Sequence, residues 1–481
     1  MVAGIPSRAS RVITAWGVAS TLGCGGGGGS GSGSAEGDGS ATDTASASAT
    51  VGTTAGSSGD ASASAGSEGS GGASSGGAST AADSSAEGSV YFDVGMPDAG
   101  TPGGCECGSQ LGFSYIWIAN TDDGSVAKLN TQTMIEEGRY RTMAAQLVGE
   151  TGPSRTSVNL SGRAVAVANR GGGLTKINTL ADDCDPNANG TPGLQTSSGA
   201  GDVQPFMEDD CVAWHTPFPY DTQRPVAWAP GVLHEEDCSY TDEKVWTAGC
   251  SVANGDVWVT VNLVDGDTGT VEQAIVIDGF ECSSLSPYGG AVNAAGDFWF
   301  TNLVPGNDRM GFVDRETFDF QVYTPPITPY GMTVDHAGRP WLAQWVGAQS
   351  ASAARYDPAT DSWAIADNHV AYVMSGIQED AQGRMWMNYW TYDGGMSGGL
   401  TYIDVETMQV GPAFEIAATE RRGISVDLDG KIWSTARYAN TAYRFDPDTL
   451  QIDTYPMLIG PYTYSDMTGW GLQSVSCGPE G

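Results

Sequence analysis

A motif that recurs through the second half of the chain constrains its fold more than any other feature. Four copies run from a glycine to a tryptophan ten residues later, namely Gly289–Trp299, Gly331–Trp341, Gly376–Trp386 and Gly423–Trp433. A second glycine stands three residues before each tryptophan, where it favours a tight turn between two short strands. The copies recur every 42 to 47 residues, and weaker copies surround Trp117, Val165 and Trp258.

Repeats of this length that are built of strands are typical of β-propellers, because one small sheet buries both faces only by stacking on its neighbours. The sequence therefore predicts an all-β fold, a seven-bladed β-propeller. The first unit lacks an inner strand, and the last unit, "MTGWGLQSVSC", lacks the Gly-x-x-Trp half. We expect the two ends of the propeller to share one blade, with Cys477 bonded to Cys105 or Cys107.

One stretch breaks the rhythm of the repeats. Val165 and Trp258 are 93 residues apart, about twice a period, and four cysteines lie within residues 180–250. The stretch is either a disulfide-rich excursion from one blade or an eighth blade. Its turn-rich composition, as in "DCDPNANGTPGLQTSSGAGD", favours the excursion.

The N-terminal segment has the features of an export signal. Arg8 and Arg11 precede an apolar run from Val12 to Leu22, and Cys24 follows small residues. Residues 1–24 resemble a bacterial lipoprotein signal, in which Cys24 would be lipidated; plain secretion is the alternative. Residues 25–104 are almost entirely Gly, Ser, Ala and Thr, which predicts a disordered linker before a propeller of residues 105–481. We expect an exported lipoprotein of the outer membrane or cell surface.

Cysteine usage agrees with export. Besides Cys24, an even number of cysteines remains, and in an exported chain these predict disulfides. No C-x-x-C occurs, which disfavours a zinc site. The disulfide candidates are Cys105, Cys107, Cys184, Cys211, Cys238, Cys250, Cys282 and Cys477.

The formal net charge of −36 excludes several partner classes. A field of this sign repels nucleic acid and anionic lipid, and no Lys/Arg cluster is expected to offer a local exception. We therefore expect no nucleic-acid partner, membrane contact only through the lipid anchor, and a monomer.

A short acidic segment resembles half of a calcium-binding loop. Asp185, Asn187, Asn189 and Gly190 match D-x-N-x-N-G, but Thr196 stands where the bidentate carboxylate belongs. An Asn/Gly-rich turn that binds nothing has a similar sequence. The prediction is a structural Ca²⁺ held by Asp185, Asn187 and Asn189.

The blade pattern P-x-G-[IM]-x-x-[DN]-x-x-G-x-x-W-[FLM] resembles streptogramin B (virginiamycin B) lyases and NHL-type propellers, over roughly residues 115–475. The resemblance implies a seven-bladed propeller in which histidines before the blade glycines, a glutamate and Mg²⁺ open a cyclic depsipeptide by elimination. Here Tyr288, Tyr330, Ser375 and Arg422 occupy the histidine position. The glutamate position is occupied by Asn302, Gln344, Tyr389 and Ala436, so no catalytic residue is predicted.

The residues at these positions are expected to gather at one end of the central channel. Aromatic faces, amides and a guanidinium suit a sugar or peptide ligand, although polar residues at strand ends also serve to hold channel water. The predicted ligand-binding residues are Tyr288, Tyr330, Asn302, Gln344, Tyr389 and Arg422. Two functions compete: a binding module for a glycan, peptide or envelope protein, and a lyase or lactonase-type enzyme with a rearranged site, which alone would require Mg²⁺.

Overall fold

The structure is a computed structural model that describes residues 112–144, 151–234, 236–345, 351–367, 373–390, 398–416, 420–463 and 465–478. The predictions for residues 1–111 lie outside the described residues. These are the signal segment, lipidation of Cys24, the linker, Cys105 and Cys107.

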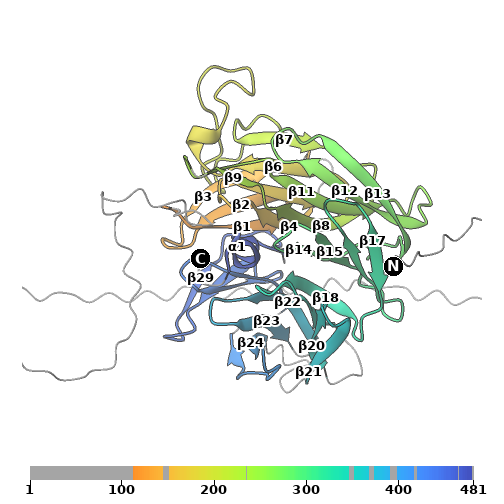
Figure 1. Cartoon of the computed structure of the whole chain (residues 1–481). Coiled ribbons are helices and arrows are strands. Elements are labelled where there is room, and N and C mark those ends of the chain that lie inside the picture. Colours follow the sequence, from red (N-terminus) through yellow and green to blue (C-terminus); the bar gives the residue numbers. More distant parts are fainter. Residues whose placement is uncertain are drawn as a thin grey trace, which may run out of the picture. The chain divides into compact units, whose positions relative to one another are not determined.

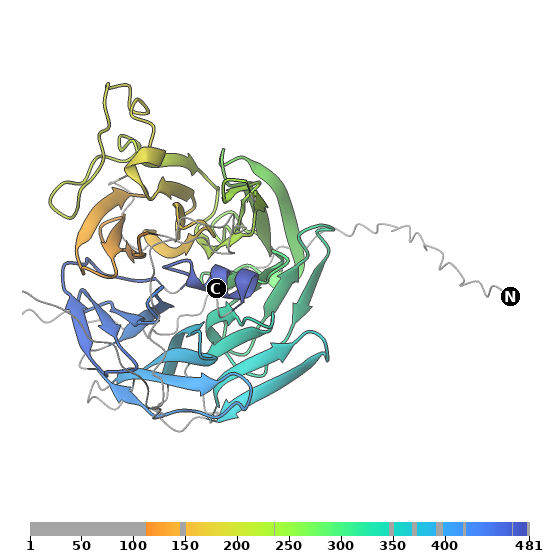
Figure 2. The ribbon, with the colours of Figure 1, turned by 60° about the vertical axis from the view of Figure 1, so that its left-hand side comes forward.

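Seven sheets surround a central axis, which confirms the seven-bladed propeller (Figures 1 and 2). In chain order, the first three sheets consist of β1 (Tyr115–Asn120), β2 (Ser125–Asn130) and β3 (Glu136–Arg141); β4 (Pro153–Val158), β5 (Ala164–Asn169), β6 (Leu174–Asn178) and β7 (Val212–Thr216); and β8 (Thr222–Ala229), β11 (Lys244–Cys250), β12 (Trp258–Asp265) and β13 (Val271–Glu281).

The remaining four sheets each contain four strands that are consecutive in sequence. They are β14 (Gly290–Val292), β15 (Phe298–Thr301), β16 (Met310–Val313) and β17 (Phe320–Tyr323); β18 (Pro329–Val334), β19 (Pro340–Gln344), β20 (Ala351–Asp357) and β21 (Ser362–Asp367); β22 (Val373–Glu379), β23 (Arg384–Trp390), β24 (Gly398–Asp404) and β25 (Phe414–Glu415); and β26 (Arg421–Val426), β27 (Ile432–Ala436), β28 (Thr441–Phe445) and β29 (Ile452–Tyr455).

The first strand of each complete sheet is its inner strand. The inner strands β4, β8, β14, β18, β22 and β26 contact one another in that order around the axis. The three-stranded first sheet receives its inner edge from the other end of the chain. Tyr462 N donates to Ala119 O at 3.1 Å, and Trp117 N donates to Met467 O at 2.9 Å. This confirms that the two ends of the chain share a blade. The segment "MTGWGLQSVSC", which the sequence pattern assigns to the inner strand, instead forms α1 from Trp470 onward, and the pairing with β1 lies just before it.

Helix α1 (Trp470–Cys477) follows the closing segment and lies near the middle of the ring of sheets (Figure 2). Its Trp470 Nε1 donates to Glu379 O, at the end of β22, at 2.8 Å. The helix therefore covers the axis at the ends of the inner strands. Cys477 is disulfide-bonded, but its predicted partners, Cys105 and Cys107, lie outside the described residues.

Residues 180–250 form no eighth blade in the described part of the chain. Residues 179–211 are a loop between β6 and β7, closed near its base by the Cys184–Cys211 disulfide, and the loop extends away from the sheets (Figure 1). A small hairpin of β9 (Val232–His234) and β10 (Ser239–Thr241) is inserted between β8 and β11. The rest of the stretch supplies ordinary blade strands.

The weak copy of the motif at Trp258 was misassigned. Trp258 begins the third strand of its sheet, whereas the fully buried Trp246 lies on the second strand, where the other copies place their tryptophan. The error arose because the turn at Gly255, with φ of 79°, resembles the motif turn but joins the second and third strands.

The repeated motif forms a turn that is held by one carboxylate. The motif glycines Gly338, Gly383 and Gly430 have φ between 69° and 79°, which glycine adopts without strain. Within the last copy, Asp427 accepts hydrogen bonds from Trp433 Nε1 at 2.7 Å and from Lys431 N at 2.9 Å. Asp335 and Asp380 bind their tryptophans in the same way, at 2.9 and 2.6 Å. The aspartate therefore joins each turn to its blade core.

We predict that Asp427→Ala lowers the free energy of unfolding by about 2 kcal/mol, because it leaves buried N–H donors without an acceptor. Asp427→Asn should cost less, since Asn293 holds the turn of its own copy by accepting from Asp297 N at 3.0 Å. Denaturant unfolding measures both changes, with Asp429→Ala, an exposed neighbour, as the control. Equal losses for the Ala and Asn variants would contradict this role.

Candidate ligand-binding site at one end of the axis

The inner strands are irregular at the end of the axis that lies opposite α1. The register between inner and second strands shifts near the start of β4, β8, β18, β22 and β26. Such β-bulges turn side chains away from the regular alternation of a strand. Arg224, Tyr330 and Arg422 lie at these bulges and belong to three different blades.

Three tyrosines join across the axis at this end. Tyr462 OH forms hydrogen bonds with Tyr288 OH at 2.8 Å and with Tyr330 OH at 3.1 Å. Tyr288 and Tyr330 are 2% and 0% exposed, and Tyr462 is 8% exposed. Each comes from the inner edge of a different sheet, so the three phenols connect three blades.

Arginines surround these phenols. The guanidinium carbons of Arg155, Arg170, Arg422 and Arg437 lie 5.8, 5.1, 5.7 and 5.2 Å from the ring centre of Tyr462. Arg224 lies 5.2 Å from the ring centre of Tyr288, and these distances are typical of cation–π contacts. We call this group the arginine–tyrosine cluster; its members are Arg155, Arg170, Arg224, Arg422, Arg437, Tyr288, Tyr330 and Tyr462.

Two tryptophans extend the aromatic surface on one side of the cluster. Trp345 stacks on Tyr330 with ring centres 4.4 Å apart, and Trp390 meets Trp345 edge-on at 5.6 Å. Arg422 lies about 5 Å from both indole rings and donates to Tyr330 OH at 2.9 Å. Arg422 thus links the tryptophans to the phenols.

The cluster has more positive than negative charge. Among the described residues, two carboxylates pair with its five arginines: Glu420 with Arg422, and Asp122 with Arg437 at 3.5 Å. Burial lowers the pKa of Arg170, and the nearby Arg224 lowers it further. The expectation that no Lys/Arg cluster exists is therefore wrong in three dimensions, because the fold assembles one from residues far apart in sequence.

The arginines also change the acidity of Tyr462. Burial alone would raise its pKa, but the positive charges of Arg155 and Arg422 outweigh burial and lower the pKa to about 8. Burial instead raises the pKa of Tyr288 and of Tyr330. Tyr462 is thus the phenol in the cluster that ionises most readily.

The structure brings together three of the six predicted site residues: Tyr288, Tyr330 and Arg422. Asn302 bonds within its own loop, to Asn307 O and Arg309 N, each at 2.8 Å.

The other two predicted residues also have different neighbours. Gln344 donates to Trp345 O at 2.7 Å, and Tyr389 packs in a core with Trp341 and Met374. In three blades the position one residue further along (Trp345, Trp390 and Arg437) contacts the cluster instead. A shift of one residue along a strand reverses the face that a side chain occupies.

One sequence pattern, a Pro-Tyr dipeptide, indicates Tyr462 as a member of the cluster. The dipeptides Pro287-Tyr288, Pro329-Tyr330 and Pro461-Tyr462 stand at the start of three inner strands. Apart from Arg422, the arginines carried no such signal: Arg155, Arg170 and Arg224 are isolated in the sequence, although Arg170 and Arg437 both directly follow the second strand of their sheets.

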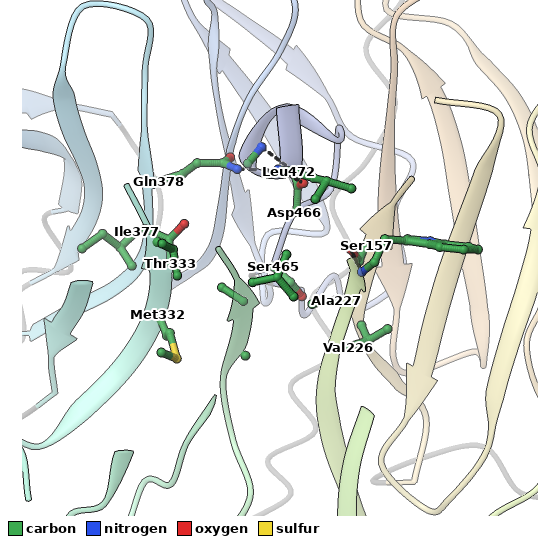
Figure 3. Close-up of a pocket in the computed structure, with 16 residues that line it drawn as sticks. Ser157, Val226, Ala227, Met332, Thr333, Ile377, Gln378, Ser465, Asp466 and Leu472 are labelled. Atoms are coloured by element: carbon green, nitrogen blue, oxygen red, sulfur yellow. Dashed lines mark hydrogen bonds between the residues drawn. The ribbon is translucent and has the colours of Figure 1, made fainter. Parts of the chain in front are cut away.

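Beyond the cluster, the axis narrows to a cavity of about 30 Å³ beneath α1, room for roughly one water. Figure 3 shows Asp466, Gln378 and Leu472 around it. The buried Asp466 accepts hydrogen bonds from Gly471 N at 3.0 Å and Leu472 N at 2.8 Å, which fixes the start of the helix.

The segment predicted to bind calcium forms a turn on the loop between β6 and β7. Asp185 Oδ1 accepts from Asn187 N at 3.0 Å, and Asn189 Oδ1 accepts from Thr191 N at 2.8 Å. Over the residues that the structure describes, no three His, Cys, Asp or Glu side chains gather in a way that could hold a metal ion. The Ca²⁺ site stays a prediction.

Comparison with known proteins gives matches among solved structures alone. No family model matches the chain, and no curated protein matches it. The chain resembles selenomethionine-substituted virginiamycin B lyase from Staphylococcus aureus, with 16% identity, a TM-score of 0.45, and coverage of 66% of this chain and 91% of that one.

Two further solved structures are similar. One is a streptogramin B lyase, with 19% identity, a TM-score of 0.36, and coverage of 51% of this chain and 76% of that one. The other is apo AztD from Citrobacter koseri, with 11% identity, a TM-score of 0.43, and coverage of 74% and 97%. These are likenesses in fold.

The disulfides indicate the compartment. Cys184–Cys211 and Cys250–Cys282 are bonded, and Cys238 is also in a disulfide. Such bonds form and persist outside the reducing cytosol, so the protein is extracytoplasmic. In the described ranges, no helix has the length and apolarity that crossing a membrane requires.

We predict that one tyrosine ionises with a pKa of about 8 when phenolate absorbance is followed as pH rises. Tyr462→Phe should remove this phase, and Arg422→Gln should move it to higher pH because a stabilising positive charge is lost. Tyr438→Phe, at a side chain that is 68% exposed, is the control. A first phase near the ordinary phenol pKa of about 10 would refute the assignment.

Proposed function

We propose that the protein is an exported binding module whose ligand site is the arginine–tyrosine cluster. The observation that carries this proposal is the convergence of five guanidiniums and three phenols from different blades at one end of the axis. Arg, Tyr and Trp are the residue types that most often dominate binding surfaces, because they combine a large apolar area with polar groups.

The energetics of the cluster favour function over stability. Burying a cation without a matching anion destabilises a fold. Arg170 is half-buried, its Nε and Nη2 have no acceptor among the described residues, and burial lowers its pKa. A group of arginines kept for stability alone would be expected to pair with carboxylates. A site that is prepared for a ligand explains the excess of charge.

An enzyme with a rearranged site is the second candidate, and one observation favours it. A phenol with a pKa of about 8, as at Tyr462, is a usable general base near neutral pH. The cluster does not suit Mg²⁺, however, because this ion prefers carboxylate and phosphate oxygens and the residues around Tyr462 are mainly cationic. We therefore place metal-dependent lyase or lactonase chemistry second.

The rest of the proposal concerns attachment and partners. Lipidation of Cys24 would fix the chain to an envelope membrane, and residues 25–104 would act as a tether of roughly 50 Å. The monomeric propeller would then present its cluster to a glycan, a peptide or an envelope protein.

The test is a thermal-shift screen of the full exported protein against cell-wall sugars, peptides and a streptogramin B. A ligand at a hundred times its Kd adds about 2.7 kcal/mol of stability. We expect Tyr330→Phe and Arg422→Gln to weaken the shift, and Arg163→Gln, at an exposed side chain paired with Asp183, to leave it unchanged. Turnover of a screened compound that Tyr462→Phe abolishes would instead favour the enzyme.

A further inference from the structure

We propose that the arginine–tyrosine cluster recognises an oxyanion on its ligand (a carboxylate, sulfate or phosphate) through Arg170, Arg224 and Arg437. This inference rests on the proposed function and names the chemical class of its ligand. The three arginines come from three blades: Arg170 follows β5, Arg224 lies on β8 and Arg437 follows β27. All three are half-buried, whereas Arg155 is fully buried.

The first argument concerns buried hydrogen-bond donors that have no acceptor among the described residues. Arg170 Nε and Nη2 are buried and have no acceptor among the described residues. The same is true of the Nε atoms of Arg224, Arg422 and Arg437. Buried N–H groups of charged side chains are costly to leave without acceptors. An oxyanion carries two or more acceptor oxygens, and guanidinium forks match carboxylate, sulfate and phosphate geometry.

The second argument is the convergence of like charges. Arg170 and Arg437 lie on the ring of Tyr462 at 5.1 and 5.2 Å, and Arg224 is close enough to oppose the charge of Arg170. Repulsion between neighbouring cations destabilises this arrangement unless an anion compensates it. The carboxylate of Asp122 reaches only Arg437, at 3.5 Å, and is half exposed.

The third argument is contrast with the rest of the molecule. The chain carries 57 acidic and 21 basic residues, so its surface as a whole repels anions. Five of those basic residues meet at one end of the axis, and two carboxylates among the described residues pair with them. A local positive field in an acidic protein attracts anions selectively and should weaken as salt screens it.

The aromatic side chains beside the cluster indicate that the ligand has a second, flat or apolar part in addition to its oxyanion. Trp345 and Trp390 lie beside Arg422, and Trp345 is partly exposed. A flat or apolar portion of a ligand would contact these rings while its oxyanion lies among the arginines. An acidic sugar has both parts, whereas a free inorganic anion has only one.

The experiment titrates the phenolate absorbance of Tyr462 in the full exported protein with glucuronate, glucose or sodium sulfate, at ionic strength held constant with sodium chloride. Bound oxyanion adds negative charge beside the phenol, so glucuronate and sulfate should raise the pKa of Tyr462 and glucose should not. We expect Arg170→Gln to weaken anion binding about tenfold or more, as for the loss of a charged hydrogen bond.

Two further variants guard against a folding defect. Arg170→Lys keeps the positive charge but loses the two parallel N–H donors of the guanidinium. Its affinity for the anion should lie between those of the wild type and Arg170→Gln. Arg437→Gln should weaken binding in the same way, while Arg163→Gln serves as the matched control away from the cluster. A circular dichroism spectrum like that of the wild type and a cooperative melting transition would show that these variants fold.

The outcomes separate this inference from the proposed function. If glucuronate binds more tightly than sulfate, oxyanion recognition is supported and the oxyanion belongs to an acidic sugar. If the two bind equally, oxyanion recognition is supported and the ligand is a free anion. If glucose binds as tightly as glucuronate and Tyr330→Phe weakens both, the oxyanion is wrong but the binding site stands. If no anion shifts Tyr462 and cluster variants leave every ligand from the screen unaffected, both proposals fail.

Discussion

The propeller depends on backbone pairing between its two ends. Residues 460–463 and 465–467 lie along β1, where Tyr462 N donates to Ala119 O, and on the other side Val158 N donates to Asp466 O at 3.3 Å. Without this pairing the first sheet would have three strands and an open inner edge, and the ring would not close. The same segment carries Tyr462 to the axis and leads into α1. Ring closure, the position of Tyr462 on the axis and the placement of α1 therefore all depend on this one segment.

The two ends of the axis have opposite character. Beneath α1, backbone N–H groups satisfy the buried Asp466, and the remaining space holds about one water. At the other end, buried guanidiniums have donors without acceptors among the described residues. The first end thus contributes to stability, and the second end is the one at which we propose that a ligand binds. This asymmetry follows from the bulges near the start of the inner strands, which aim Arg224, Tyr330 and Arg422 inward.

The sequence predicted the candidate site only in part, for physical reasons that differ between residues. Tyr288, Tyr330 and Arg422 were found because the position before a blade glycine is tied to the motif turn through a short strand. Gln344 and Tyr389 each stand one residue before a side chain that contacts the cluster, and successive side chains of a strand point to opposite faces. Asn302 lies in the loop after β15 and bonds within it. Arg155, Arg170 and Arg437 stand alone in sequence, so their meeting around Tyr462 could not be read from any local pattern.

The sequence by itself determined the repeat and its strand-turn-strand unit, because both depend on residues within about ten positions of one another. It also determined the shared blade, because that follows from the number of repeats and from the halves that the first and last repeats lack. Glycine with positive φ, an aspartate that accepts from the blade tryptophan and alternating apolar strands recur in register, and only a closed ring buries all of them. The tertiary structure alone decided that Trp246 takes the place assigned to Trp258, and that five arginines meet in a strongly acidic chain. The spacing of charged residues along the sequence does not determine how they cluster in the fold, because these arginines come from blades that are far apart in the chain.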